Sequence, residues 1–156
     1  PEVIDALRAR GVAWETVLLH VGAGTFKPVE AEDPAEHVMH HERFTLSPAT
    51  ADALTATRAR GGAVWAVGTT ALRVLESTVD ASGAFGARSG STNIFIRPPY
   101  TVRGADHLIT NFHLPKSTLL MLVAAFAGYD LTMDAYATAV AEGYRFYSYG
   151  DAMCIV

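Results

Sequence analysis

The sequence LITNFHLPKSTLLMLVAAFAG, residues 108–128, contains a strand-like apolar segment, a polar loop and an apolar segment of helical length, in that order. Ser117 can cap the predicted helix, and Gly128 is a typical residue for its end. A polar loop on a buried scaffold is a favourable place for a binding site. The alternative is an ordinary capping loop, in which Asn111 and His113 hydrogen-bond to nearby backbone.

Strands and helices alternate along the rest of the chain. This alternation predicts an α/β fold with a mixed, mainly parallel sheet flanked by helices. In such sheets ligands bind where the carboxyl ends of strands meet the amino ends of helices. Further strands are expected at residues 13–21, 63–67, 92–96 and 151–156, helices at 3–10, 48–60, 69–77, 117–128 and from 132 onward, and a loop at 80–91. Ser47 is the expected cap of the helix at 48–60, and Pro48 suits its first position.

The composition is that of a single globular domain. The 156 residues include 50% hydrophobic and 18% charged side chains, with a formal net charge of −4. One cysteine excludes an internal disulfide and a four-cysteine zinc site. The longest apolar run, residues 119–127, is shorter than the ~20 residues that span a bilayer, and no secretory signal is recognisable, so we expect a cytoplasmic protein without membrane contact. The acidic balance argues against a self-sufficient nucleic-acid binder.

Two candidate segments lie in the first third of the chain. Gly22 and Gly24, followed by Thr25, would let the backbone approach a ligand closely after a strand, although a plain tight turn fits as well and the dinucleotide fingerprint is incomplete. The sequence HVMHHE, residues 37–42, matches no standard zinc spacing. Acid–base chemistry by His40 and Glu42 on one face of a strand is therefore preferred over a metal site, with a solvated strand edge as the alternative.

Two more segments combine polar and aromatic groups. In GTTALRVLE, residues 68–76, free backbone N–H groups and two hydroxyls at a helix start favour an anion, and Arg73 lies one turn further on. Ordinary capping with an Arg73–Glu76 pair is the alternative. In YRFYSYGD, residues 144–151, aromatic side chains interleaved with arginine are able to stack on a base, or simply to fill a core.

Together these segments resemble the S-adenosylmethionine:tRNA ribosyltransferase-isomerase family of queuosine biosynthesis. The resemblance covers nearly the whole chain, with one departure at Pro99, where family members usually have glycine. Family members are about twice as long, so the resemblance implies a carboxy-terminal part without the amino-terminal half and its inserted β-barrel domain. The matching stretches are residues 19–29, 37–42, 66–76, 92–100, 108–128 and 144–153.

The resemblance implies that the ribosyl group of S-adenosylmethionine is transferred to 7-aminomethyl-7-deazaguanine in the tRNA anticodon. The products are epoxyqueuosine-tRNA, adenine and methionine; S-adenosylmethionine is a consumed cosubstrate, and no metal is needed. The implied partners are this tRNA and either the amino-terminal half of the family or a second copy of the chain. The alternatives are a non-catalytic module that binds S-adenosylmethionine or a nucleoside, and a transferase with a small acceptor.

The resemblance also implies roles for individual residues. Because histidine titrates near neutral pH, His40 with Glu42, or His113, is the implied base or proton shuttle. With Arg73 on the methionine carboxylate, these roles would require Gly24, Arg73, Asn111 and His113 to share one pocket. The candidate catalytic residues are His40, Glu42, His113 and Asp151. The candidate substrate-binding residues are Gly22, Gly24, Thr25, Thr69, Thr70, Arg73, Thr110, Asn111, Lys116, Ser117, Arg145 and Tyr149.

Overall fold

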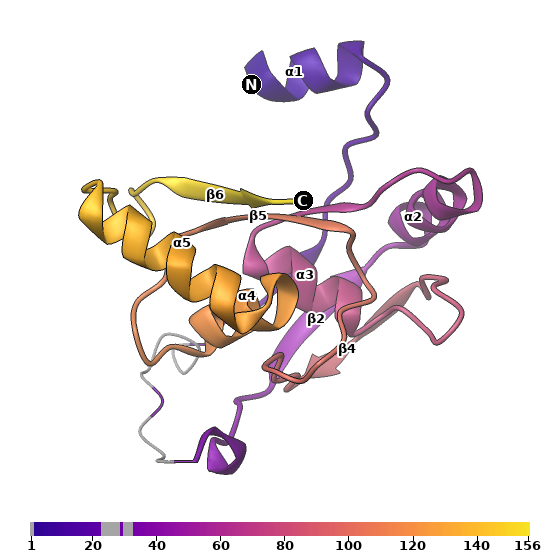
Figure 1. Ribbon diagram of the computed structural model, residues 1–156. Coiled ribbons are helices and arrows are strands. Elements are labelled where there is room, and N and C mark those ends of the chain that lie inside the picture. The colour runs from indigo at the N-terminus through magenta and orange to yellow at the C-terminus, as the bar shows by residue number, and fades with distance from the viewer. Residues whose placement is uncertain (1, 23–28, 30–32) are drawn as a thin grey trace.

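A computed structural model describes residues 2–22, 29 and 33–156. Within this part of the chain, no single helix is long and apolar enough to cross a membrane. The helices Thr118–Ala127 and Tyr129–Ala141 reach the required length and hydropathy only when taken together, and they are bent by 118° relative to each other. The elements are α1 (Glu2–Ala9), β1 (Leu18–Leu19), η2 (Pro34–Glu36), β2 (Glu42–Leu46), α2 (Pro48–Ala59), β3 (Trp65–Val67), α3 (Thr69–Glu76), β4 (Arg88–Thr92), β5 (His107–Asn111), α4 (Thr118–Ala127), α5 (Tyr129–Ala141) and β6 (Ala152–Ile155) (Figure 1).

The strands form two three-stranded sheets, in the orders β1-β2-β4 and β3-β5-β6. The predicted α/β class is confirmed. The expectation of mainly parallel pairing is wrong, because among the described strands only β3 and β5 pair in parallel. A parallel pair needs a crossover connection, and α3 lies on the connection between β3 and β5. Two helices, α4 and α5, separate β5 from β6, and the chain re-enters the sheet antiparallel.

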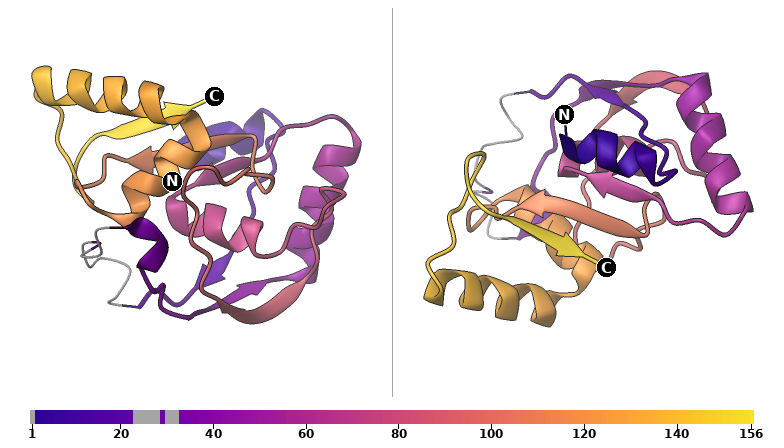
Figure 2. Two further views of the ribbon diagram at one scale, coloured as in Figure 1. Left: turned by 60° about the horizontal axis from the view of Figure 1, so that its bottom comes forward. Right: turned by 90° about the horizontal axis from the view of Figure 1, so that it is seen from above.

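Helix α3 lies between the two sheets, since it contacts β1 and β2 of one and β3 and β5 of the other (Figure 1). Its Leu72 and Val74 are fully buried, together with Ala66 of β3 and Leu108 of β5. A smaller cluster around Phe112 packs against α4 and α5. Both views in Figure 2 show α4, α5 and β6 on one side of the molecule and α2 on the other.

The helix starts predicted from capping residues are confirmed. Ser47 accepts a hydrogen bond from the backbone N–H of Thr50 at 3.1 Å, and α2 begins at the next residue. Ser117 does the same for Leu120 at 3.1 Å at the start of α4. Helix α4 ends at Gly128, whose φ of 90° allows the chain to turn.

Three other predicted boundaries are wrong. The strand expected at residues 13–21 is only Leu18–Leu19. The strand expected at residues 92–96 is instead Arg88–Thr92, because pairing with β2 outweighs the weak strand propensity of its serine and glycine residues. The loop expected at residues 80–91 therefore ends earlier, before Arg88. Helix α5 begins at Tyr129, not at residue 132, because the positive φ of Gly128 completes the turn within one residue.

Candidate functional site

A cavity of about 240 Å³ lies where β3 meets α3 and where β5 leads towards α4. The backbone N–H of Gly68 donates to the carbonyl of Ile109 at 2.8 Å, which holds the ends of the two parallel strands together. The carboxyl ends of parallel strands open at one sheet edge, so their following loops meet there. The lining residues are 68–70, 110–115, 117, 119, 147 and 148.

The described residues of the cavity lining are uncharged and combine polar with apolar side chains. Among the described residues, the lining contains the hydroxyls of threonine and serine residues, the Asn111 amide and the His113 imidazole, and no aspartate, glutamate, lysine or arginine. The Asn111 side chain hydrogen-bonds to no other residue in the described part of the chain. Such a lining suits a neutral ligand that carries both donors and acceptors.

His113 is the histidine of the described cavity lining. Its Nε2 lies 3.0 Å from Oγ1 of Thr110, and its backbone N–H donates to the Tyr136 hydroxyl at 2.8 Å. Burial disfavours the charged imidazolium and lowers the pKa of His113 from 6.5 to about 4. The ring is therefore neutral at pH 7. Titration near neutral pH, the reason for assigning His113 to proton transfer, does not apply; the role itself stays a prediction.

Several predicted substrate-binding residues share this cavity. The hydroxyl of Ser117 is already engaged, because it accepts from the backbone N–H of Leu120 at the start of α4 and donates to the carbonyl of Leu114 at 2.7 Å. Lys116 is exposed and lies outside the lining; its carbonyl accepts from the backbone N–H of Val29 at 2.7 Å. The predicted residues that line the cavity are Thr69, Thr70, Thr110, Asn111, His113 and Ser117.

Glu42 and Arg73 form a buried ion pair outside this lining. Glu42 is 1% exposed, accepts from the backbone N–H of Gly22 at 2.8 Å, and binds Nη1 of Arg73. Arg73 is 3% exposed and contacts a second, much smaller cavity. The expected alternative, an Arg73–Glu76 pair, is wrong, because Glu76 binds the Tyr100 hydroxyl and two backbone N–H groups. The role of Arg73 towards a methionine carboxylate stays a prediction.

His40 and Glu42 do not share the predicted strand face. Strand β2 begins only at Glu42, so the alternation does not extend back to His40, which is exposed. Among the described residues, no group of three histidine, cysteine, aspartate or glutamate side chains is placed to hold a metal ion. Gly24 and Thr25 lie outside the described residues, and Gly22 is the described residue of that motif.

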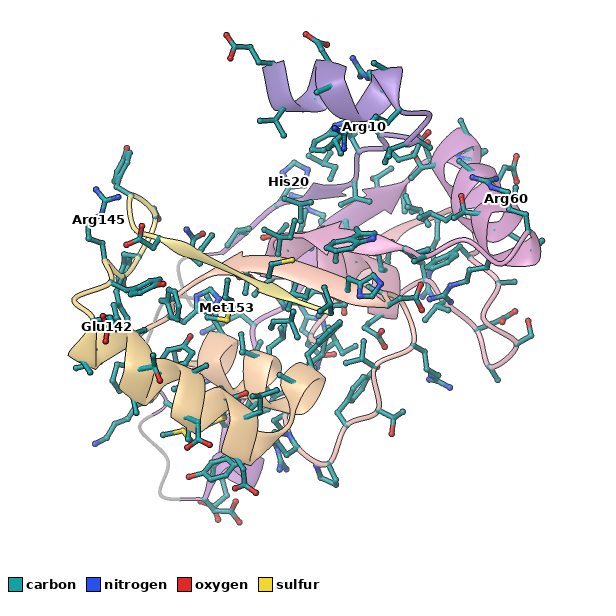
Figure 3. All side chains as sticks on the ribbon, turned by 45° about the horizontal axis from the view of Figure 1, so that its top comes forward. Arg10, His20, Arg60, Glu142, Arg145 and Met153 are labelled. Carbon is teal, nitrogen blue, oxygen red and sulfur yellow. The ribbon has the colours of Figure 1, made fainter. Side chains whose placement is uncertain are left out.

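The aromatic segment divides between the cavity and the solvent. Tyr147 and Ser148 line the cavity, although neither was among the candidate site residues. Tyr149 is 97% exposed, and Arg145 extends into solvent from the turn before β6 (Figure 3). Asp151 accepts from the backbone N–H of Arg145 at 2.8 Å, and this hydrogen bond lowers the pKa of the carboxyl. The sequence marked the segment, but it carried no signal for which side chains turn inward.

The whole chain matches a known family. Residues 1–155 match the family model described as queuosine biosynthesis protein. The chain belongs to this family. A relative from Moorella thermoacetica, named S-adenosylmethionine:tRNA ribosyltransferase-isomerase, is 55% identical over all 156 residues of the chain. A relative of the same name from Gluconacetobacter diazotrophicus is 59% identical over 152 residues.

A solved structure agrees with this assignment to the queuosine family. The crystal structure of S-adenosylmethionine tRNA ribosyltransferase from Thermotoga maritima is 43% identical and matches with a TM-score of 0.81. It covers 100% of this chain, which in turn covers 49% of that one. The chain also spans only 46% and 43% of the lengths of the Moorella and Gluconacetobacter relatives.

Proposed function

We propose that this chain carries the S-adenosylmethionine site of a tRNA ribosyltransferase-isomerase of queuosine biosynthesis. The reaction transfers and isomerises the ribosyl group onto 7-aminomethyl-7-deazaguanine in the tRNA anticodon, in the cytoplasm, without a metal. Epoxyqueuosine-tRNA, adenine and methionine are the products. The observation that carries the proposal is the cavity of about 240 Å³, because segments that resemble the family converge on it from three separate stretches of the chain.

The cavity is proposed to receive the adenine base. Sites for whole small molecules usually measure ~300–1,000 Å³, so a cavity of about 240 Å³ suits part of S-adenosylmethionine. The described lining residues carry no charge, which favours the neutral base over the zwitterionic methionine end, since burying an unpaired charge is costly. The Asn111 amide offers a donor and an acceptor to the N6 and N7 edge of adenine, and the Tyr147 ring offers a stacking surface.

The neutral imidazole of His113 is proposed to donate a hydrogen bond to a ring nitrogen of the departing adenine. This requires the tautomer with the proton on the nitrogen that faces the base. The reaction also needs a base that removes a C5′ proton next to the sulfonium. That role stays with the predicted candidates outside the lining, His40, Glu42 and Asp151.

Contacts to tRNA are assigned to other surfaces. With a net charge of −4, the chain has no overall basic surplus for phosphate binding. The rest of the length seen in relatives, or a second copy of the chain, is proposed to supply it. Arg145 and Tyr149, both exposed on the turn before β6, remain candidates for contact with the RNA.

The test compares Asn111→Ala with Asn93→Ala, a matched control at an exposed position outside the cavity lining. Affinity for S-adenosylmethionine is measured by calorimetry, and adenine release is followed with precursor-bearing tRNA. We expect Asn111→Ala to weaken binding by roughly tenfold, as for the loss of about one net hydrogen bond, and Asn93→Ala to leave it unchanged. Equal affinity in both variants would contradict the proposal.

A further inference from the structure

Arg73 and Thr118 bury polar atoms that find no hydrogen-bond partner within the described part of the chain. These atoms are Nε and Nη2 of Arg73 and Oγ1 of Thr118. The two residues are 3% and 4% exposed, so bulk water does not reach these atoms. Burial without a partner disfavours the folded state, and native proteins rarely leave such groups unsatisfied.

Both residues line the same small cavity, of about 10 Å³. The other described residues of its lining are apolar and include Met39, Ile96 and Leu122. A cavity of ~10–15 Å³ holds about one water molecule, which needs two to four polar partners. Here the guanidinium and the hydroxyl supply three polar atoms, so both the volume and the chemistry fit one water.

The charge balance also favours a neutral occupant. The Glu42 carboxylate already pairs with Nη1 of Arg73, so the guanidinium charge is compensated. A second carboxylate would add an uncompensated negative charge beside the apolar side chains of the described lining, so a neutral occupant here competes with the predicted role of Arg73 towards a methionine carboxylate. A second carboxylate would also require more room than about 10 Å³.

We propose that this cavity binds one structural water molecule that bridges Arg73 and Thr118. The water accepts hydrogen bonds from Nε–H and Nη2–H of Arg73 and donates one to Oγ1 of Thr118. A continuous chain of hydrogen bonds then runs from the Gly22 backbone through Glu42 and Arg73 to the first residue of α4.

This bridge gives Arg73 a positioning role. Ser117 and Leu119, the neighbours of Thr118, both line the cavity of about 240 Å³. Fixing the start of α4 therefore fixes part of that lining. The consequence for S-adenosylmethionine binding rests on the proposed function, whereas the water site itself does not.

The test compares Thr118→Val with Thr118→Ser in the full chain. Valine keeps the side-chain volume but removes the hydroxyl, and serine keeps the hydroxyl but removes the methyl group. Crystal structures of the parent and the serine variant should show an ordered water within hydrogen-bonding distance of Arg73 Nε, and the valine variant should not. S-adenosylmethionine affinity should fall by roughly tenfold in the valine variant and stay within about threefold in the serine variant.

Three results would overturn the inference. One is a parent structure that shows other buried waters but none between Arg73 and Thr118. Another is a complex in which the methionine carboxylate of S-adenosylmethionine binds there. The third is the reverse ranking, with serine more damaging than valine, which a packing role predicts. If no variant binds S-adenosylmethionine, the proposed function fails, while the electron density still decides the water site.

Discussion

The buried Glu42–Arg73 pair leads to the sharpest stability prediction. Glu42→Gln keeps the side-chain shape but removes the negative charge, and it leaves the Arg73 guanidinium 3% exposed without that partner charge. Removing one partner of a buried ion pair costs ~3–5 kcal/mol. Since domains are stable by only ~5–15 kcal/mol, we expect the loss to be a large fraction of the total.

Urea unfolding followed by circular dichroism measures this loss. Glu142→Gln is the matched control, because Glu142 is an exposed carboxylate at the end of α5, and we expect it to change stability by less than ~0.5 kcal/mol. The double variant Glu42→Gln/Arg73→Met removes both charges and should be more stable than the sum of the single effects predicts. A free energy of unfolding for Glu42→Gln within ~0.5 kcal/mol of the parent would refute this reasoning.

Three further predictions concern pH, a turn and tRNA. The pKa of His113 is about 4 in the folded chain and 6.5 in the unfolded chain, so the unfolded chain binds the proton more readily, and the stabilising contribution of neutral His113 should be fully present above pH 6.5 and decline towards pH 4. The free energy of unfolding of His113→Gln, measured in urea, should therefore fall less between pH 7 and pH 5 than that of the parent, and equal falls would contradict this. Gly150→Ala should destabilise the chain by roughly 1–3 kcal/mol in thermal unfolding, because a Cβ there would lie 2.3 Å from the Arg145 carbonyl oxygen. In the control Gly86→Ala the nearest contact of the Cβ is at 3.8 Å, so its loss of stability should be clearly smaller, and equal losses would contradict the prediction. The affinity of the chain alone for tRNA should depend less steeply on salt than that of the longer Moorella relative, because the chain alone neutralises fewer phosphates. Equal slopes of log affinity against log salt concentration for the two proteins would count against the assignment of tRNA contacts to other surfaces.

Local signals in the sequence predicted much of the fold. Ser47 and Ser117 satisfy free N–H groups at helix starts, and this chemistry depends on neighbours only three residues away. The strand–helix order also predicted that functional loops follow strands. Residues 68–70 and 110–115 do line one cavity, because β3 and β5 lie side by side and in parallel.

Long-range partners were not predictable from single segments. The Arg73 side chain pairs with Glu42, 31 residues away in sequence, and not with the local Glu76. Of the four residues expected to share a pocket, Asn111 and His113 line the cavity, Arg73 does not, and Gly24 lies outside the described residues. Sequence patterns show which residue types are present but not which buried charges form ion pairs, since that pairing depends on how the two sheets pack around α3.

A crystal structure of the chain with S-adenosylmethionine bound tests the central proposal most directly. We expect the adenine base to occupy the cavity of about 240 Å³, with hydrogen bonds to the Asn111 amide and the His113 imidazole. Adenine bound elsewhere, with Asn111 and His113 free of contact, would contradict the account.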